Sequence, residues 1–153
     1  MTRALGPIRL QTEAETAALA GRIAPLLAAG DTLLLEGEIG AGKSAFARAL
    51  IRARLGRFED VPSPTFTLVQ TYEAADVSIW HADLYRLTSP DEVFELGLDE
   101  AFEDAICLIE WPDRLGPDAP EGALTLRFEA TPKGHLLTVT GPDHWLNRLS
   151  EAF

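Results

Sequence analysis

The sequence predicts an α/β fold, in which helices cover both faces of a mixed sheet with a parallel core and antiparallel hairpins. A glycine-rich segment, Gly37–Ser44, lies between a short apolar run and a helix-like pattern, as a loop between a strand and a helix does in such folds. Further apolar runs bounded by turn residues indicate buried strands. Two pairs of alternating segments, each joined by a short turn, predict the hairpins.

Length and charge limit the possible functions. The chain has 153 residues, and we expect residues 1–153 to form a single domain. With 13 basic and 24 acidic residues, its formal net charge is −11, which disfavours tight, independent binding to a nucleic-acid backbone. Arginines gather only at helical spacing, where a solvated helix face is the ordinary interpretation: Arg48, Arg52, Arg54 and Arg57. Any nucleic-acid role is therefore expected to run through protein partners.

Three features favour a cytoplasmic protein. No run of about 18 apolar residues is present, so no membrane span is predicted. The N-terminal residues lack the continuous apolar segment of a secretory signal. The single cysteine, Cys107, excludes an internal disulfide and lies in an apolar run, where a buried and inert thiol is expected.

The first predicted helix begins at Thr12, which forms a capping box with Glu15, and runs to about Ala28. Pro25 lies inside this helix and should kink it or loosen its turn near Gly21. Gly30 ends it.

The next elements predict a phosphate-binding loop. Thr32–Glu36 is a continuous apolar run typical of a short buried strand; the sequence GEIGAGKS follows at Gly37–Ser44, and then a helix ends at Gly56. Glycines let main-chain N–H groups turn inward around an anion, Lys43 suits the β- and γ-phosphates, and Ser44 offers a hydroxyl to Mg²⁺. A glycine-rich turn with an incidental lysine is the alternative. The strand, loop and helix together favour a P-loop NTPase-like three-layer sandwich.

A hairpin is predicted after this helix. Prolines within residues 61–65 indicate an extended loop, and the alternating segments Thr67–Glu73 and Val77–Ala82 then predict two antiparallel strands. The second strand leads to Asp83, which can hold a water on Mg²⁺, although a helix cap or a surface carboxylate fits its position equally well. His81 is better interpreted as a packed histidine than as a catalytic base.

Two short helices should follow, one that begins with a capping box at Ser89 and one over Asp99–Glu103. Ala105–Ile109 then predicts a buried strand, with Glu110 and Trp111 at its end. A carboxylate at that place can serve a metal ion or a water molecule, and it is also an ordinary strand terminator.

The last third of the chain needs only a structural interpretation. Leu124–Glu129 and His135–Thr140 alternate in polarity and predict a second hairpin. Residues Pro142–Phe153 predict a short terminal helix.

Four motifs, in this order and at these spacings, resemble the bacterial TsaE family, formerly YjeE: GEIGAGKS, SPTFTLVQTYE, HADLYRL and LIEWPDR. The resemblance covers almost the whole chain. It implies a small ATPase that is required to make threonylcarbamoyladenosine in tRNA, with ATP and Mg²⁺ as cofactors. It also implies a cycle driven with the partners TsaB and TsaD, with tRNA contacted only through that complex. Because the chain shows no arginine-finger motif, slow turnover by the isolated protein is expected.

The resemblance also implies roles for individual residues. Lys43, Asp83 and Glu110 would be catalytic, and the metal ligands would be Ser44, Asp83 and Glu110. Tyr85 and Arg86 would lie at a partner surface or a switch. Nucleotide contacts would come from Glu38, Ile39, Gly40, Ala41, Gly42, Lys43, Ser44, Ala45, Thr16, Thr65 and Trp111.

Some features depart from the family pattern, and other functions remain open. The loop begins Gly-Glu-Ile where Gly-Asp-Leu is more usual, Ser44 replaces the usual Thr, and Pro25 is unexpected. Glu110 is the first candidate for a general base and His81 the second. A stand-alone small-molecule kinase with a P-loop and a nucleotide-dependent scaffold without turnover are the alternatives.

Overall fold

The structure is a computed structural model that describes residues 2–38, 40–56, 61, 68–87, 89, 91–150 and 152. Ile39, Thr65 and Arg57, together with most of the predicted extended loop, lie outside the described residues.

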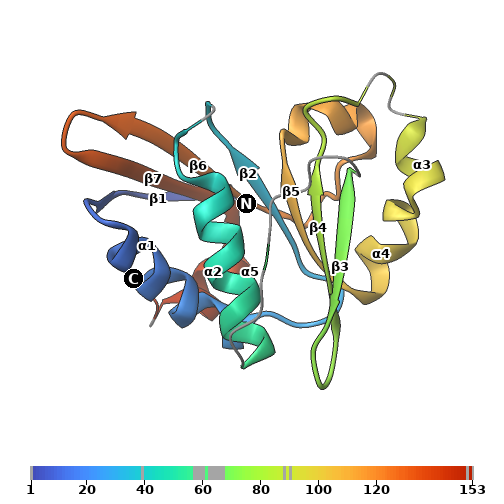
Figure 1. The fold of residues 1–153 in the computed structure, drawn as a ribbon, viewed down its shortest axis with the longest axis horizontal. Helices are drawn as coiled ribbons and strands as arrows, with labels where there is room; N and C mark the ends of the chain where they lie inside the picture. The colour runs from blue at the N-terminus through green and yellow to red at the C-terminus, as the bar shows by residue number, and fades with distance from the viewer. Residues whose placement is uncertain are drawn as a thin grey trace.

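A seven-stranded mixed sheet forms the centre of the molecule, in the order β1-β7-β6-β2-β5-β4-β3 (Figure 1). Strand β2 runs parallel to β5 and β6, and β4 runs parallel to β5, whereas β1, β7 and β3 add antiparallel pairs at the two sides. The parallel core and both predicted hairpins are thereby confirmed. The strands are β1 Thr2–Leu10, β2 Thr32–Glu36, β3 Val69–Glu73, β4 Ser78–Asp83, β5 Ile106–Glu110, β6 Leu124–Thr131 and β7 Gly134–Pro142.

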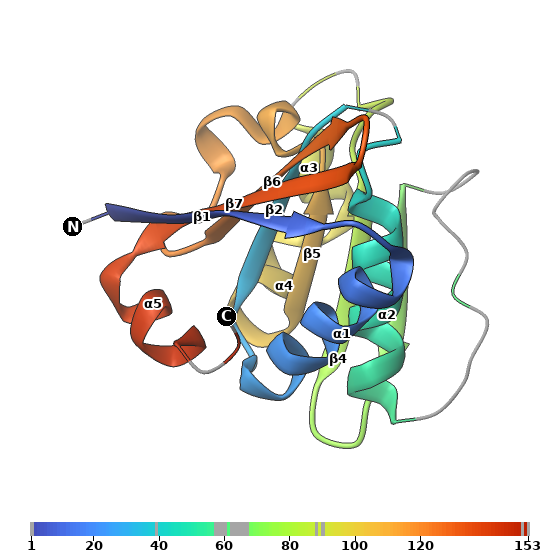
Figure 2. The same cartoon turned by 90° about the vertical axis from the view of Figure 1, so that its left-hand side faces the viewer.

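Helices cover both faces of the sheet and complete the predicted three layers (Figures 1 and 2). The longer pair, α1 and α2, packs together on one face with α5, and the short helices α3 and α4 lie on the other face with the 3₁₀ segment η2. The helical segments are α1 Glu13–Ile23, η1 Ala24–Leu26, α2 Lys43–Leu55, α3 Glu92–Leu96, α4 Leu98–Asp104, η2 Pro112–Asp118 and α5 Asp143–Leu149.

Strand β5 shows how the two cores share one sheet. All its residues are buried, and the pleat sends Ile106 and Leu108 into the core under α1 and α2, and Cys107 and Ile109 into the core under α3 and α4. Burial raises the pKa of the Cys107 thiol to about 12, because the thiolate would lose its hydration. The expectation of a buried, inert cysteine is confirmed.

The first helix ends earlier than predicted. The α-helix stops at Ile23, and the chain tightens into the 3₁₀ turn η1, which contains Pro25. The predicted end near Ala28 is therefore wrong, and the departure from α-helix lies at Ala24–Leu26 rather than near Gly21. The capping box is confirmed, because the N–H of Glu15 donates to Oγ1 of Thr12.

Two arginines bind the carbonyl groups that the short end of this helix leaves open. Arg54 of α2 donates to the carbonyls of Ala24 and Leu27, and Arg148 of α5 donates to that of Leu26. Arg54 also pairs with Asp76, and only 13% of its side chain is exposed. The interpretation of the arginine cluster as a solvated face is therefore wrong for Arg54.

The structure also differs from the prediction at α5 and at β1. Helix α5 is confined to Asp143–Leu149, whereas a helix to Phe153 was expected. Strand β1 was not predicted, because Gly6 and Pro7 interrupt its pattern; the register with β7 shifts between Leu5 and Ile8, around these two residues. No described helix has the length and apolar character that a membrane span requires.

Candidate functional site

The loop between β2 and α2 has the backbone that its glycines predict. Gly37, Gly40 and Gly42 have φ angles of 140°, 84° and 106°, in the region that favours glycine. A Cβ atom at Gly37 would lie 2.5 Å from the carbonyl oxygen of Phe128, so the loop also packs too closely on β6 for a side chain there. The strand–loop–helix context of the GEIGAGKS motif is thereby confirmed.

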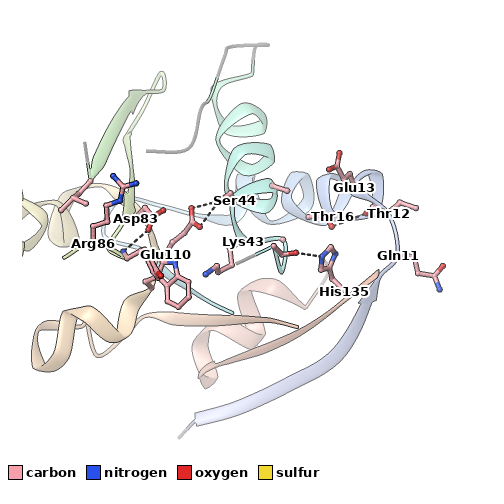
Figure 3. A pocket seen from close by; sticks show the side chains of 16 residues that line it. Gln11, Thr12, Glu13, Thr16, Lys43, Ser44, Asp83, Arg86, Glu110 and His135 are labelled. Atoms are coloured by element: carbon pink, nitrogen blue, oxygen red, sulfur yellow. Dashed lines mark hydrogen bonds between the residues drawn. The ribbon is translucent and has the colours of Figure 1, made fainter. Parts of the chain in front are cut away.

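A pocket of about 610 Å³ opens beside this loop (Figure 3). Glu38 and Ala41 are not among its lining residues, so of the described loop positions Gly40 and Gly42–Ala45 face it. Its lining residues are Gln11, Thr12, Glu13, Thr16, Gly40, Gly42, Lys43, Ser44, Ala45, Leu68, Asp83, Tyr85, Arg86, Glu110, Trp111 and His135.

The sheet brings the two predicted carboxylates together. Asp83 ends β4, Glu110 ends β5, and the two residues are register partners on these parallel neighbours. Because the carboxyl ends of parallel strands meet at one edge of a sheet, both carboxylates face the amino end of α2. Glu110 is a buried carboxylate, and Asp83 is half-buried.

A chain of polar contacts runs from the loop into the sheet. The Ser44 hydroxyl lies 3.0 Å and 3.2 Å from the two carboxylate oxygens of Glu110, to which it donates, and Nε2 of His81 lies 2.7 Å from Oε2 of Glu110. His81 is 1% exposed and does not line the pocket. His81 therefore reaches the pocket only through Glu110, which weakens the interpretation of this histidine as a catalytic base.

Lys43 is buried at the bottom of the pocket. Its ammonium group donates to the carbonyl of Gly37 and lies 3.7 Å from the centre of the Trp111 ring, a cation–π contact. Desolvation lowers the pKa of Lys43, although the negative charges of Glu110 and Asp83 oppose this effect. A buried ammonium with these partners is suited to bind an anion that replaces lost hydration.

Asp83 experiences the opposite effect. Burial raises the pKa of its carboxyl group, and the nearby Glu110 charge adds to the shift, whereas the hydrogen bond from the N–H of Tyr85 opposes it. A cation bound beside Asp83 and Glu110 would stabilise the charged forms of both carboxylates, because it offsets the repulsion between them.

Trp111 closes this end of the pocket. It has a positive φ of 58°, which is uncommon for a residue other than glycine, and its ring lies 4.9 Å from that of Tyr85, centre to centre. The turn into η2 thus places the indole over Lys43.

The opposite end of the pocket comes from other parts of the chain. Thr16, which the family resemblance implies as a nucleotide contact, is buried, and its hydroxyl lies 3.4 Å from the Thr12 carbonyl. His135 of β7 lies beside the loop, with Nε2 3.3 Å from the carbonyl oxygen of Gly40. His135 was not predicted as a site residue, because strand alternation does not reveal which end of a hairpin meets the loop.

The donor set fits Mg²⁺. Ser44, Asp83 and Glu110 present a hydroxyl and two carboxylates on adjoining elements, and oxygen atoms are the ligands that Mg²⁺ prefers. Within the described residues no group of three or more His, Cys, Asp or Glu side chains gathers into a metal cage. Mg²⁺ sites in proteins commonly rely on one or two carboxylates together with substrate phosphates.

Comparisons with known proteins give consistent matches. The family model of "Threonylcarbamoyl adenosine biosynthesis protein TsaE" matches residues 10–136. The tRNA threonylcarbamoyladenosine biosynthesis protein TsaE of Rickettsia conorii is 46% identical over 104 residues, which are 68% of this chain and 59% of that protein. The TsaE protein of Bacillus subtilis is 38% identical over 113 residues, which are 73% of this chain and 70% of that protein.

The fold has a counterpart among solved structures. The crystal structure of YdiB from Bacillus subtilis superposes with a TM-score of 0.78 at 27% sequence identity, over 99% of this chain and 95% of that one.

Proposed function

Since the chain belongs to the TsaE family of threonylcarbamoyl adenosine biosynthesis proteins, we propose that it binds and hydrolyses ATP with Mg²⁺ in tRNA threonylcarbamoyladenosine biosynthesis. Its hydrolysis would drive the cycle of a complex with TsaB and TsaD. In that complex TsaD, not this chain, would transfer the threonylcarbamoyl group, and this chain would meet the tRNA only through the complex. The whole chain would act as one ATPase domain.

One observation carries the proposal: Lys43, Ser44, Asp83 and Glu110 converge on a pocket beside a glycine-rich loop between a parallel strand and a helix. A cation, a hydroxyl and two carboxylates are the groups that phosphoryl transfer requires around a triphosphate and its metal ion. The main-chain N–H groups at the start of α2 add the partial positive charge of a helix N-terminus.

Each side chain has a distinct task in this proposal. Lys43 leaves the Gly37 carbonyl and binds the β- and γ-phosphates, where its partly desolvated ammonium regains a charged partner. Ser44 turns from Glu110 and, with Asp83 and Glu110, would hold Mg²⁺. When bound, the ion neutralises phosphate charge. Glu110 would retain its hydrogen-bond contact with His81.

Glu110 is the better placed of the two candidates for orienting the attacking water. Its carboxylate lines the pocket, whereas His81 lies behind it. The sequence shows no arginine-finger motif, so a partner protein is expected to supply additional groups and to raise a slow basal rate.

Phosphate release with the purified chain, with and without purified TsaB and TsaD, tests this function. We expect slow, Mg²⁺-dependent release that the two partners accelerate at least about tenfold, since groups supplied in trans can be worth far more. Asp83→Asn should lose this release, and Glu121→Gln, which removes an exposed carboxylate, should keep it. Transfer of phosphate to a metabolite, or binding without release under all conditions, would contradict the proposal.

A further inference from the structure

His81 lies beneath the two carboxylates, on the face of the sheet that α2 covers. The pleat of β4 places Ile79, His81 and Asp83 on one face, and Ile79 belongs to the core under α1 and α2. In the register of β4 and β5, His81 lies beside Leu108. Glu110 lies one step of the pleat further along β5, beside Asp83. The imidazole therefore stands between the Glu110 carboxylate and the apolar core.

The polar contact of this imidazole is directed at Glu110. Its Nε2 atom lies 2.7 Å from Oε2 of Glu110, whereas its Nδ1 atom has no hydrogen-bond partner among the described residues. A carboxylate oxygen can only accept, so Nε2 carries a proton and donates it. His81 is 1% exposed, and burial of an imidazole with one nitrogen unpartnered costs more than burial of an apolar side chain. Packing alone therefore does not account for a histidine at this position.

The two oxygens of the Glu110 carboxylate have different neighbours. Oε2 is close to both Nε2 of His81 and the Ser44 hydroxyl, whereas Oε1 is the nearer of the two to that hydroxyl, at 3.0 Å (Figure 3). If Ser44 turns toward a metal ion, Oε2 keeps the imidazole and Oε1 loses the hydroxyl. Oε1 is then the oxygen that is released to the pocket.

We infer that His81 is a positioning residue that fixes Oε2 of Glu110 and so directs Oε1 toward the metal ion or the attacking water, which rests on the proposed function. A carboxylate can turn about its last bond, and a half-turn exchanges its two oxygens. A donor 2.7 Å from Oε2, on the core side, opposes that turn. Carboxylates that serve a metal ion are commonly held by such hydrogen bonds, and loss of the donor typically weakens metal binding or activity by about 10–100-fold.

Two amide substitutions test whether the position of the donor matters. His81→Gln places an N–H group about where Nε2 of the imidazole lies, whereas His81→Asn carries the same group on a shorter side chain, near the place of Nδ1. We expect His81→Gln to keep Mg²⁺-dependent phosphate release within about threefold of the unaltered chain and His81→Asn to lose about 10–100-fold. Both side chains are amides, so a requirement for polarity alone would not separate them.

ATP binding provides a readout that does not depend on turnover. Calorimetric titrations with ATP at a series of Mg²⁺ concentrations give the Mg²⁺ concentration that supports half of the maximal ATP affinity. This concentration should rise about tenfold in His81→Asn and should stay within about twofold in His81→Gln. His144→Asn, at an exposed histidine on α5, is the control and should change neither the rate nor the Mg²⁺ requirement.

NMR of the intact, ¹⁵N-labelled chain observes the contact itself. The Nε2–H proton of His81 should be protected from exchange with water, because the ring is buried and the proton is donated to a carboxylate. The absence of this signal from His81→Gln assigns it. We expect the signal to persist when ATP and Mg²⁺ saturate the chain. Its loss on saturation would overturn the inference, because Glu110 would then have left His81.

The outcomes separate this inference from the proposed function. Rates and Mg²⁺ requirements are compared per folded chain, with the folded fraction taken from urea unfolding, so a loss of stability cannot imitate the effect. Equal values for His81→Gln and His81→Asn, whether both high or both low, would overturn the positioning role while ATP hydrolysis by the unaltered chain stands. Absence of Mg²⁺-dependent ATP binding and hydrolysis in the unaltered chain would overturn the proposed function and this inference together.

Discussion

Asp83, a residue of the candidate site, lowers the stability of the ligand-free protein. Burial raises the pKa of its carboxyl group above the ordinary value of 3.8. Between 3.8 and the raised pKa, the native state holds a proton that the unfolded chain has lost, so the free energy of unfolding falls as the pH rises through this window. Above the window, the charged form remains less favourable in the folded state.

Asp83→Asn should therefore stabilise the ligand-free protein at pH 7. The gain should be less than about 1 kcal/mol, because solvent screens a half-buried charge, and the Asn oxygen can still accept from the N–H of Tyr85. Urea unfolding between pH 4 and 7 measures the change, with Glu121→Gln as the control for loss of an exposed carboxylate. A variant less stable than the unaltered chain at pH 7 would contradict this account of Asp83.

His81 and Glu110 form a buried pair whose members depend on each other. His81→Leu should destabilise the fold by about 2–4 kcal/mol, since it leaves the Glu110 carboxylate buried with fewer partners. Glu110→Leu in the same chain should recover much of that loss. A double-mutant cycle in urea tests this coupling, and additive losses for the two substitutions would show that the contact carries no energy of its own.

At the scale of elements, two glycines distinguish the effect of loop geometry on stability from the effect of helix propensity. Gly37→Ala should destabilise the protein by at least about 2 kcal/mol, because φ is 140° and the new Cβ would meet the Phe128 carbonyl. Gly21→Ala is the matched control: Gly21 lies in α1 with open space around it, so alanine should stabilise the fold by about 0.5–1 kcal/mol. Thermal unfolding of both variants checks the pair, and similar effects of the same sign would refute the proposed loop strain.

Elements with a strong local pattern were predictable from the sequence. The buried strands β2 and β5, the loop at Gly37–Ser44 and both hairpins follow from apolar runs, glycines and alternation. Strand β1 was not predictable in this way, since Gly6 and Pro7 break its pattern and pairing with β7, distant in the sequence, stabilises it. Likewise, Arg54 and Arg148 bind the carbonyl groups at the end of the first helix only once α2 and α5 pack there.

The site was predictable to a different degree at its two ends. Lys43, Ser44, Asp83 and Glu110 stand at element boundaries that local patterns mark. The meeting of Asp83 and Glu110 requires that β4 lie parallel beside β5, which the sheet order shows and the local patterns do not. His135 and the contact of His81 with Glu110 depend on tertiary packing. Ordinary strand alternation places both histidines but does not identify their partners.

At the scale of the whole molecule, the sheet supports both the fold and the pocket. The two buried cores meet along β5, and the carboxyl ends of β4 and β5 carry the carboxylates to the start of α2. With a net charge of −11, the chain must concentrate its positive potential locally to bind a triphosphate, and Lys43 with the start of α2 does so. The central claim is therefore that this one place binds ATP with Mg²⁺.

Isothermal titration calorimetry of the purified chain with ATP and Mg²⁺ tests that claim most directly. We predict saturable binding of one ATP per chain that requires Mg²⁺, a loss of at least about 100-fold in affinity for Lys43→Ala, since a charged hydrogen-bonding group is removed, and little change for Arg127→Ala on the exposed side of β6. Undetectable heat with the unaltered, folded chain, or equal affinity in the Lys43→Ala variant, would contradict it.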